Sequence, residues 1–89
     1  MKIPARALIP VRKSYTTSDG QLVETQVGIQ PDSSGWKLKS EFWAQTCPEL
    51  GKCLIGYCDG FGSTLEEAVD RFLTHLEEQG GSVTEWKEI

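Results

Sequence analysis

The sequence has little histidine and cysteine, two residue types that metal and catalytic sites often use. It contains one histidine, His75, and three cysteines, Cys47, Cys53 and Cys58. The C-x5-C-x4-C spacing differs from the short knuckles of zinc sites, and an odd number of cysteines cannot all pair within one chain. We therefore expect reduced thiols, no metal and no cofactor. Cys53 and Cys58 are interpreted as small apolar residues in or near the core.

Long apolar runs and catalytic motifs are missing as well. No run approaches the ~18–20 residues of a membrane span, and the first residues lack the apolar stretch and cleavage site of a secretory signal. A cytoplasmic protein is expected. Gly56, Gly60 and Gly62 do not follow a G-x-G-x-x-G spacing. Because the helical carboxylates described below lie on one flank and do not converge, we expect that the protein is not an enzyme.

Size and charge suggest one small domain with two unlike halves. At 89 residues and 38% hydrophobic, the chain forms one domain, residues 1–89, with one modest core. Residues 1–40 carry six basic and three acidic side chains, a net charge of +3, whereas residues 41–89 carry three basic and ten acidic ones, a net charge of −7. The acidic half is suited to a basic partner, or it is simply a solvated face that keeps the domain soluble.

The segment 62–81 has the clearest pattern. Ser63 or Thr64 can cap a helix, because each is followed three residues later by a glutamate that can reach back to the cap's own amide. Gly80 and Gly81 end the helix, since glycine enters the left-handed conformation easily. The apolar stripe of this helix consists of Leu65, Ala68, Val69, Phe72, Leu73 and Leu76.

Alternating residues predict antiparallel strands before the helix. In the first strand Ala7, Ile9 and Val11 share one face, and Pro10, which has no amide hydrogen, predicts a sheet edge or a bulge. Asp19-Gly20 predicts a tight hairpin, and the turn-rich segment 31–35 predicts a second one. The inward-facing residues of the next two strands are Val23, Thr25, Val27 and Ile29, and then Trp36, Leu38, Ser40, Phe42 and Ala44.

Residues 47–62 form the least regular segment. We expect a turn at Pro48 and Gly51, a short strand over 53–58 and a crossover to the helix. Residues 82–89, with Val83 and Trp86 as apolar anchors, can return as a short edge strand. The predicted fold is therefore α+β, an antiparallel sheet of three to five strands with one long helix packed on one face, in the order β-β-β-(β)-α-(β).

Part of the chain resembles a known family. The matching motifs are Gly35-Trp36 at the start of a strand, Pro48-Glu49-Leu50, and the glycine-rich turn into the helix over 60–69. This pattern resembles HicB-type antitoxins. The resemblance implies a truncated ribonuclease-H-like fold. It also implies a protein that has no catalytic activity of its own and acts by covering an RNA-cleaving toxin. Two features differ: the first hairpin is longer than the pattern requires, and no DNA-binding tail follows Ile89, so a stand-alone blocker is expected.

The acidic helix is the leading candidate site. Negative charge in the last turn is disfavoured by the helix macrodipole, so local stability does not explain the glutamates there. We predict a small non-catalytic module that inhibits or sequesters a basic nucleic-acid-processing partner, such as a nuclease or toxin. Phage-encoded anti-CRISPR inhibitors are similar in size and charge, though not in sequence. The predicted contact residues are Glu66, Glu67, Asp70, Glu77 and Glu78, with Trp43 on the sheet as a second contact surface.

The alternative function is binding of RNA or another single strand by the open face of the sheet. On a sheet, aromatic side chains can stack on the bases of a single strand, and basic side chains can neutralise its phosphates. The candidate residues are Arg12, Lys13, Lys37, Lys39 and Trp43. The acidic pI of about 4.9 opposes this alternative. Trp43 can instead stack on a neighbouring side chain, and a homodimer can form if the edge strand at 5–11 or the tail pairs two copies.

Overall fold

The described part of the chain folds into two sheets and one helix. The computed structural model describes residues 1–11, 22–47 and 51–89. The elements are β1 (Lys2–Pro10), β2 (Leu22–Gln26), β3 (Gly28–Asp32), β4 (Gly35–Cys47), β5 (Gly51–Gly62), α1 (Leu65–Glu78) and β6 (Ser82–Glu88). The antiparallel sheets have the orders β2-β1-β6 and β3-β4-β5. The α+β class is confirmed, and in place of one sheet the described residues form two three-stranded sheets.

The two sheets separate at Val27. The alternation predicted for 23–29 is confirmed, because Val23 and Ile29 are half-buried whereas Glu24 and Gln26 are exposed. The predicted strand is nevertheless interrupted. The Val27 amide donates to the carbonyl of Ala5 at 2.8 Å, and beyond it the chain leaves β1 and pairs with β4. One alternating segment thus supplies β2 to the first sheet and β3 to the second.

β1 is the central strand of its sheet, and the prediction of an edge strand from Pro10 is wrong. Pro10 is tolerated because it ends β1 opposite Leu22, beyond the point where pairing with β6 stops at Leu8. The bulge is instead at the other proline, where the β1–β6 register shifts between Pro4 and Arg6. Both prolines occupy positions where a missing amide is tolerated. The predicted Asp19-Gly20 turn lies outside the described residues.

The β3–β4 hairpin closes where the turn-rich segment predicts it. Asp32 pairs with Gly35, with Ser33 and Ser34 between them. Trp36, predicted to face inward, is 37% exposed, because it lies at the start of β4 and pairs with Gly62, the last residue of β5. The other inward-facing residues of β4 are buried as predicted: Leu38, Ser40, Phe42 and Ala44.

β5 is a long strand where the sequence predicts a short strand and a crossover, and its pairing with β4 contains two register shifts. It has 12 residues and pairs with β4 from Gly51 to Gly62. Gly51, the predicted turn glycine, has a positive φ of 70°, whereas Gly56, Gly60 and Gly62 lie where neighbouring atoms leave no room for a side chain. A Cβ on Gly60 would lie 2.4 Å from the Ala68 carbonyl oxygen and 2.4 Å from the Phe72 nitrogen, so α1 rests directly on the strand backbone. Pro48 lies outside the described residues.

α1 begins and ends as predicted. Thr64 is the N-cap and accepts a hydrogen bond from the Glu67 amide at 3.2 Å. At the other end, the Gly80 amide donates to Glu77 and the Gly81 amide to Leu76, both at 2.9 Å. These two bonds form a Schellman motif, and Gly80 supplies the required positive φ of 75°.

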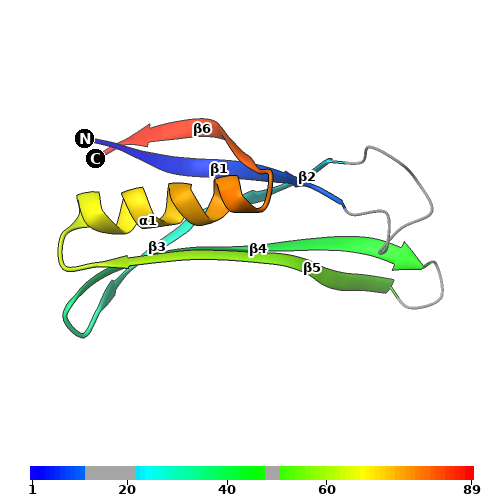
Figure 1. The fold of residues 1–89 in the computed structure, drawn as a ribbon, viewed down its shortest axis with the longest axis horizontal. Coiled ribbons are helices and arrows are strands. Elements are labelled where there is room, and N and C mark those ends of the chain that lie inside the picture. The colour runs from blue at the N-terminus through cyan, green and yellow to red at the C-terminus, as the bar shows by residue number, and fades with distance from the viewer. Residues whose placement is uncertain (12–21, 48–50) are drawn as a thin grey trace.

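The helix lies between the two sheets. Figure 1 shows α1 running between the β1–β6 pair and the β4–β5 pair. Its apolar stripe packs mainly on β5 and β4, and β1 closes the core from the other side. The core residues are Ile3, Ala7, Ile9, Leu38, Phe42, Cys58, Ala68, Val69, Phe72 and Leu76. The outer face of α1 stays exposed to solvent and carries the acidic side chains.

Candidate functional site

The predicted acidic residues all lie on the exposed side of α1. Glu66, Asp70 and Glu77 form what we term the acidic row, because residues four and eleven positions apart have nearly the same angle around a helix. Within 1–11, 22–47 and 51–89, no ion pair involves the row or Glu78. By contrast, Glu24 lies 2.6 Å from Arg6. The acidic row therefore presents charge that the described cations do not neutralise.

Glu67 differs from the acidic row because it has a structural role. Its carboxylate accepts hydrogen bonds from the Ser63 hydroxyl at 2.7 Å and from the Ser63 amide at 3.0 Å. These bonds lower the pKa of Glu67 below its ordinary value. The sequence predicts that this glutamate bonds to the amide of the cap residue. In the structure Glu67 bonds instead to the amide of Ser63, one residue before the cap Thr64. Glu67 thus stabilises the helix start, and its charge is already engaged.

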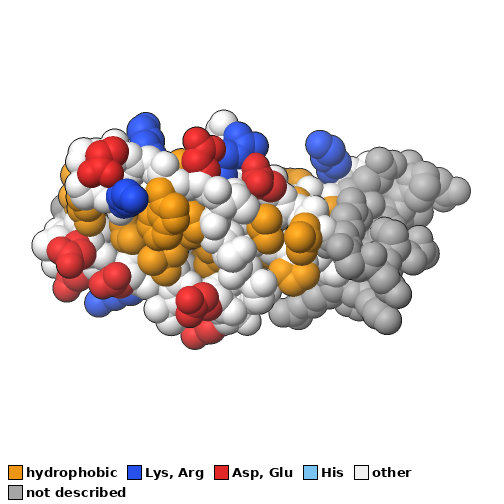
Figure 2. Space-filling model, turned by 90° about the horizontal axis from the view of Figure 1, so that it is seen from above, with side chains coloured by type: hydrophobic (Ala, Val, Ile, Leu, Met, Phe, Trp, Pro, Cys, Tyr) orange, Lys and Arg blue, Asp and Glu red, His pale blue; other side chains and the backbone are white. Residues whose placement is uncertain are grey.

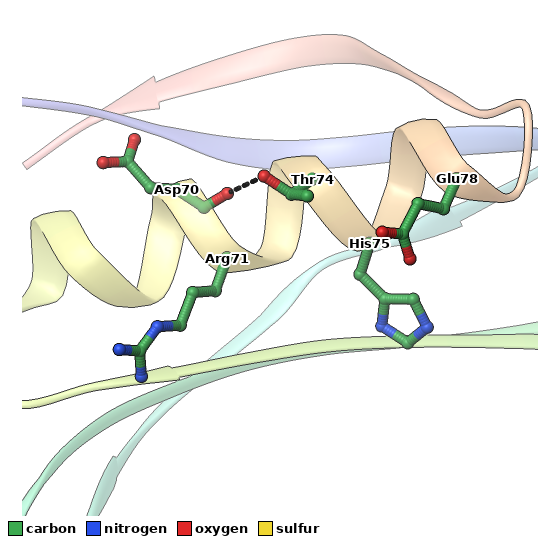
Figure 3. A pocket seen from close by; sticks show the side chains of 5 residues that line it. All are labelled: Asp70, Arg71, Thr74, His75 and Glu78. Atoms are coloured by element: carbon green, nitrogen blue, oxygen red, sulfur yellow. Dashed lines mark hydrogen bonds between the residues drawn. The ribbon is translucent and has the colours of Figure 1, made fainter.

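A shallow recess of about 300 Å³ opens on the outer side of α1 (Figure 3). Asp70 and Glu78 line it together with Thr74, whose hydroxyl donates to the Asp70 carbonyl at 3.0 Å. Arg71 and His75 form the rest of its lining and extend toward β5 (Figure 3). The two carboxylates can attract a basic side chain from a partner.

A second row on α1 covers the outer edge of β5. Arg71 Nη1 donates to the Phe61 carbonyl at 2.8 Å, and Gln79 Nε2 donates to the Tyr57 carbonyl at 2.7 Å. Between them, His75 Nδ1 accepts a hydrogen bond from the Asp59 amide at 3.2 Å. We term Arg71, His75 and Gln79 the edge cover.

The edge cover works because helix and strand repeats match. Four helical residues rise ~6 Å, and two strand residues span ~6.6 Å, so positions 71, 75 and 79 meet alternate residues 61, 59 and 57. The i, i+4, i+8 spacing of long polar side chains is the sequence signal for this arrangement, which the predictions from the sequence did not include.

The thiol of Cys58 is buried and is unsuited to nucleophilic chemistry. It donates to the Phe72 carbonyl at 3.5 Å, and burial raises its pKa to about 12. The interpretation of Cys58 as a core residue is confirmed, while Cys53 is only half-buried. In the described part of the chain, no three His, Cys, Asp or Glu residues are grouped so that they could hold a metal ion.

Trp43 lies on the other side of the molecule from the acidic row. Its side chain is 47% exposed on the outer face of the β3-β4-β5 sheet, and its Nε1 donates to Glu41 at 3.2 Å. Lys37 shares this face and places its Nζ 5.0 Å from the centre of the Phe61 ring. Lys39 is half-buried on the same face, whereas Arg12 and Lys13 lie outside the described residues. The structure therefore separates the predicted contacts into two surfaces.

A third surface is an apolar groove between α1 and β6. The groove has a volume of about 250 Å³, and its apolar lining residues are Leu73, Leu76, Val83 and Trp86. The return of the tail as an edge strand is confirmed. Trp86, however, is 47% exposed and does not anchor the core. The sequence pattern identified Trp86 as apolar but gave no sign that it faces solvent.

Comparison with known proteins assigns no family. No family model, curated protein or solved structure matches the chain. The resemblance to HicB-type antitoxins therefore stays a prediction. Among the residues that the structure describes, no helix has the length and apolar character needed to cross a membrane.

Proposed function

We propose that this protein is a non-catalytic binding module that docks on a basic, nucleic-acid-processing protein and inhibits or sequesters it. The acidic row is the observation that carries this proposal. Its three carboxylates lie along one exposed flank of a helix that both sheets hold in place. An array of this kind resembles a segment of nucleic-acid backbone in charge, and it can occupy the cationic groove of a nuclease.

The position of Glu77 and Glu78 supports a role in binding. Both lie in the last turn of α1, where the helix macrodipole makes negative charge unfavourable by ~0.3–1 kcal/mol each. Neither has an ion-pair partner among the described residues to offset this cost. The adjacent recess, with Asp70 and Glu78 in its lining, gives one basic side chain of the partner a defined place.

The test combines capture with charge reversal. The tagged protein is incubated with host lysate, the captured partner is purified, and its nucleic-acid cleavage is measured with and without the wild-type chain. Glu66→Lys with Asp70→Lys is expected to weaken binding by at least about tenfold and to abolish inhibition. The matched control, Asp32→Lys with Glu41→Lys, changes the net charge equally on other elements and is expected to retain inhibition.

Two outcomes contradict the proposal. In the first, the captured partner binds the helix double variant as tightly as the wild type. In the second, the bait retains nucleic acid and no stoichiometric protein.

The second outcome favours the alternative function, binding of single strands by the outer face of the β3-β4-β5 sheet. The observation that supports this alternative is that Lys37, Phe61 and exposed Trp43 share that face. Fluorescence anisotropy with a labelled single-stranded RNA tests it directly. Under this alternative Trp43→Ala weakens binding and the Glu66→Lys, Asp70→Lys double variant strengthens it.

A further inference from the structure

β6 presents a strand edge that no described strand covers. It pairs with β1 on one side and is the last strand of its sheet on the other. The Ile89 amide donates to the Met1 carbonyl at 2.9 Å and therefore points toward β1. Because backbone groups alternate in direction along a strand, the N–H and C=O groups of Trp86 and Glu88 point away from β1, toward the open edge.

The other edges are less suited to pairing. The edge cover occupies the outer edge of β5. β3 is only five residues long and contains Pro31, which has no amide to donate. β2 is also five residues long, and it lies close to β4. β6 has seven residues, and none of them is proline.

Apolar side chains border the open edge of β6. Trp86 is 47% exposed and lines the groove with Leu73 and Val83, and Ile89 is 61% exposed. Figure 2, viewed from above, on the side where β6 lies in Figure 1, shows apolar side chains at the surface between acidic and basic ones. An open edge beside exposed apolar side chains is a pairing surface.

The order of charges along β6 identifies the occupant. The central residues are Glu85, Trp86 and Lys87. In an antiparallel pair of two β6 strands with the two-fold axis at Trp86, Glu85 of each copy faces Lys87 of the other, and the two Trp86 side chains are neighbours. An axis at Glu85 or at Lys87 would place like charges opposite each other, which is unfavourable. We propose that β6 pairs in this register with β6 of a second copy of this chain, which joins the two β2-β1-β6 sheets into one continuous sheet.

The surrounding charges are compatible with this register. Arg6 Nε is 2.6 Å from Glu24 and 4.0 Å from Glu85, so Arg6 binds mainly Glu24 and leaves the Glu85 carboxylate for the Lys87 of the other copy. The charge of Glu88 is already offset by the amine of Met1 at 3.0 Å. The outward N–H and C=O of Trp86 would form two hydrogen bonds across the axis.

The test is the mass of the purified chain in solution. Sedimentation velocity from about 1 μM to about 1 mM is expected to show reversible dimers, because one strand pair buries a small interface. Lys87→Glu places glutamates opposite each other twice and is expected to weaken dimerisation by at least about tenfold. Glu85→Lys with Lys87→Glu reverses both charges and is expected to restore it. Lys52→Glu, which has the same charge change at an exposed position on β5, is expected to have no effect.

Three results overturn the proposal: a monomer at every concentration, a dimer indifferent to Lys87→Glu, and a double variant that fails to recover dimerisation. Circular dichroism of each variant confirms that it is folded. Trp86→Lys is a second disrupting variant, because it places two lysines at the axis and leaves the backbone groups in place. None of these substitutions touches the acidic row, so this proposal and the proposed function fail independently.

Discussion

β5 and β6 are the two outer strands nearest the helix. The free edge of β5 is covered by side chains, whereas the free edge of β6 is open among the described residues. Arg71 and Gln79 donate hydrogen bonds to carbonyls on the edge of β5, and His75 accepts one from the Asp59 amide on the same edge. The edge of β6 has no such cover among the described residues, and Trp86 beside it is exposed. Exposed strand edges favour aggregation, and natural proteins usually block them. Three side chains of α1 block the edge of β5, whereas the seven-residue edge of β6 is open among the described residues. The edge of β6 is therefore suited to pairing.

The difference follows from how α1 is held. Gly60 and Gly62 let α1 lie on the backbone of β5, so its polar flank reaches the edge of that strand. β6 lies less close to α1 than β5 does, and an apolar groove remains between α1 and β6. Close packing and edge protection are therefore consequences of the same glycines.

The largest expected effect comes from separating the helix from β5. Gly60→Ala places a Cβ 2.4 Å from the backbone of Ala68 and Phe72, and we expect the free energy of unfolding to fall by about 3 kcal/mol. Urea unfolding followed by tryptophan fluorescence measures it. The control is Gly28→Ala, where the nearest atom is 3.6 Å away and the change should stay within about 0.5 kcal/mol. Wild-type stability in Gly60→Ala would contradict this account of the packing.

A smaller effect is expected from removing one contact of the edge cover. Gln79→Ala leaves the Tyr57 carbonyl without its part-buried donor, which is expected to cost about 1 kcal/mol of unfolding free energy. Amide hydrogen exchange of β5 should accelerate in the same variant. Thr74→Ala, which removes an exposed hydroxyl bonded within α1, should change stability by under about 0.5 kcal/mol. Equal exchange rates in both variants would show that Gln79 does not protect the edge.

The smallest effect concerns the start of the helix that carries the edge cover. Hydrogen bonds from Ser63 lower the pKa of Glu67 in the folded state, so they stabilise the fold above the ordinary glutamate pKa of 4.5. That stabilisation is lost as the pH falls through the lowered value. Wild type should therefore exceed Glu67→Gln in unfolding free energy at pH 7, and the gap should close between pH 4.5 and more acidic values.

Thermal unfolding across this pH range gives the measurement. Glu66→Gln is the matched control, because the Glu66 side chain accepts no hydrogen bond among the described residues. A gap for Glu67→Gln that stays constant with pH would contradict the role of its carboxylate.

Local signals in the sequence predicted the parts of the fold that depend on neighbouring residues. The cap at Thr64, the glycine stop at Gly80 and the alternation in β4 are set within a few residues, and each is confirmed. Only a short strand over 53–58 was predicted where β5 extends from Gly51 to Gly62, because its glycines are explained only by the helix that packs on them. The break at Val27 likewise depends on a carbonyl far away in sequence, that of Ala5.

The candidate site divides in the same way. Helical periodicity placed the acidic row on one exposed flank, and this is confirmed. Periodicity could not show that Glu67 is engaged by Ser63 or that Trp86 is exposed, because both depend on contacts outside the repeating pattern. The regular spacing of the edge cover is visible in the sequence. Its role becomes clear only from the contacts of these residues with β5.

The pairing of β1 with β6 also has a consequence for the order of folding. It joins segments from opposite ends of the sequence, and the contact between Met1 and Glu88 spans 87 residues. β3, β4, β5 and α1 are consecutive and contact their neighbours along the chain. Contacts between distant residues require a costly loop closure, so the β3-β4-β5 sheet with α1 is expected to form first. The strand that carries the open edge would then be the last to dock.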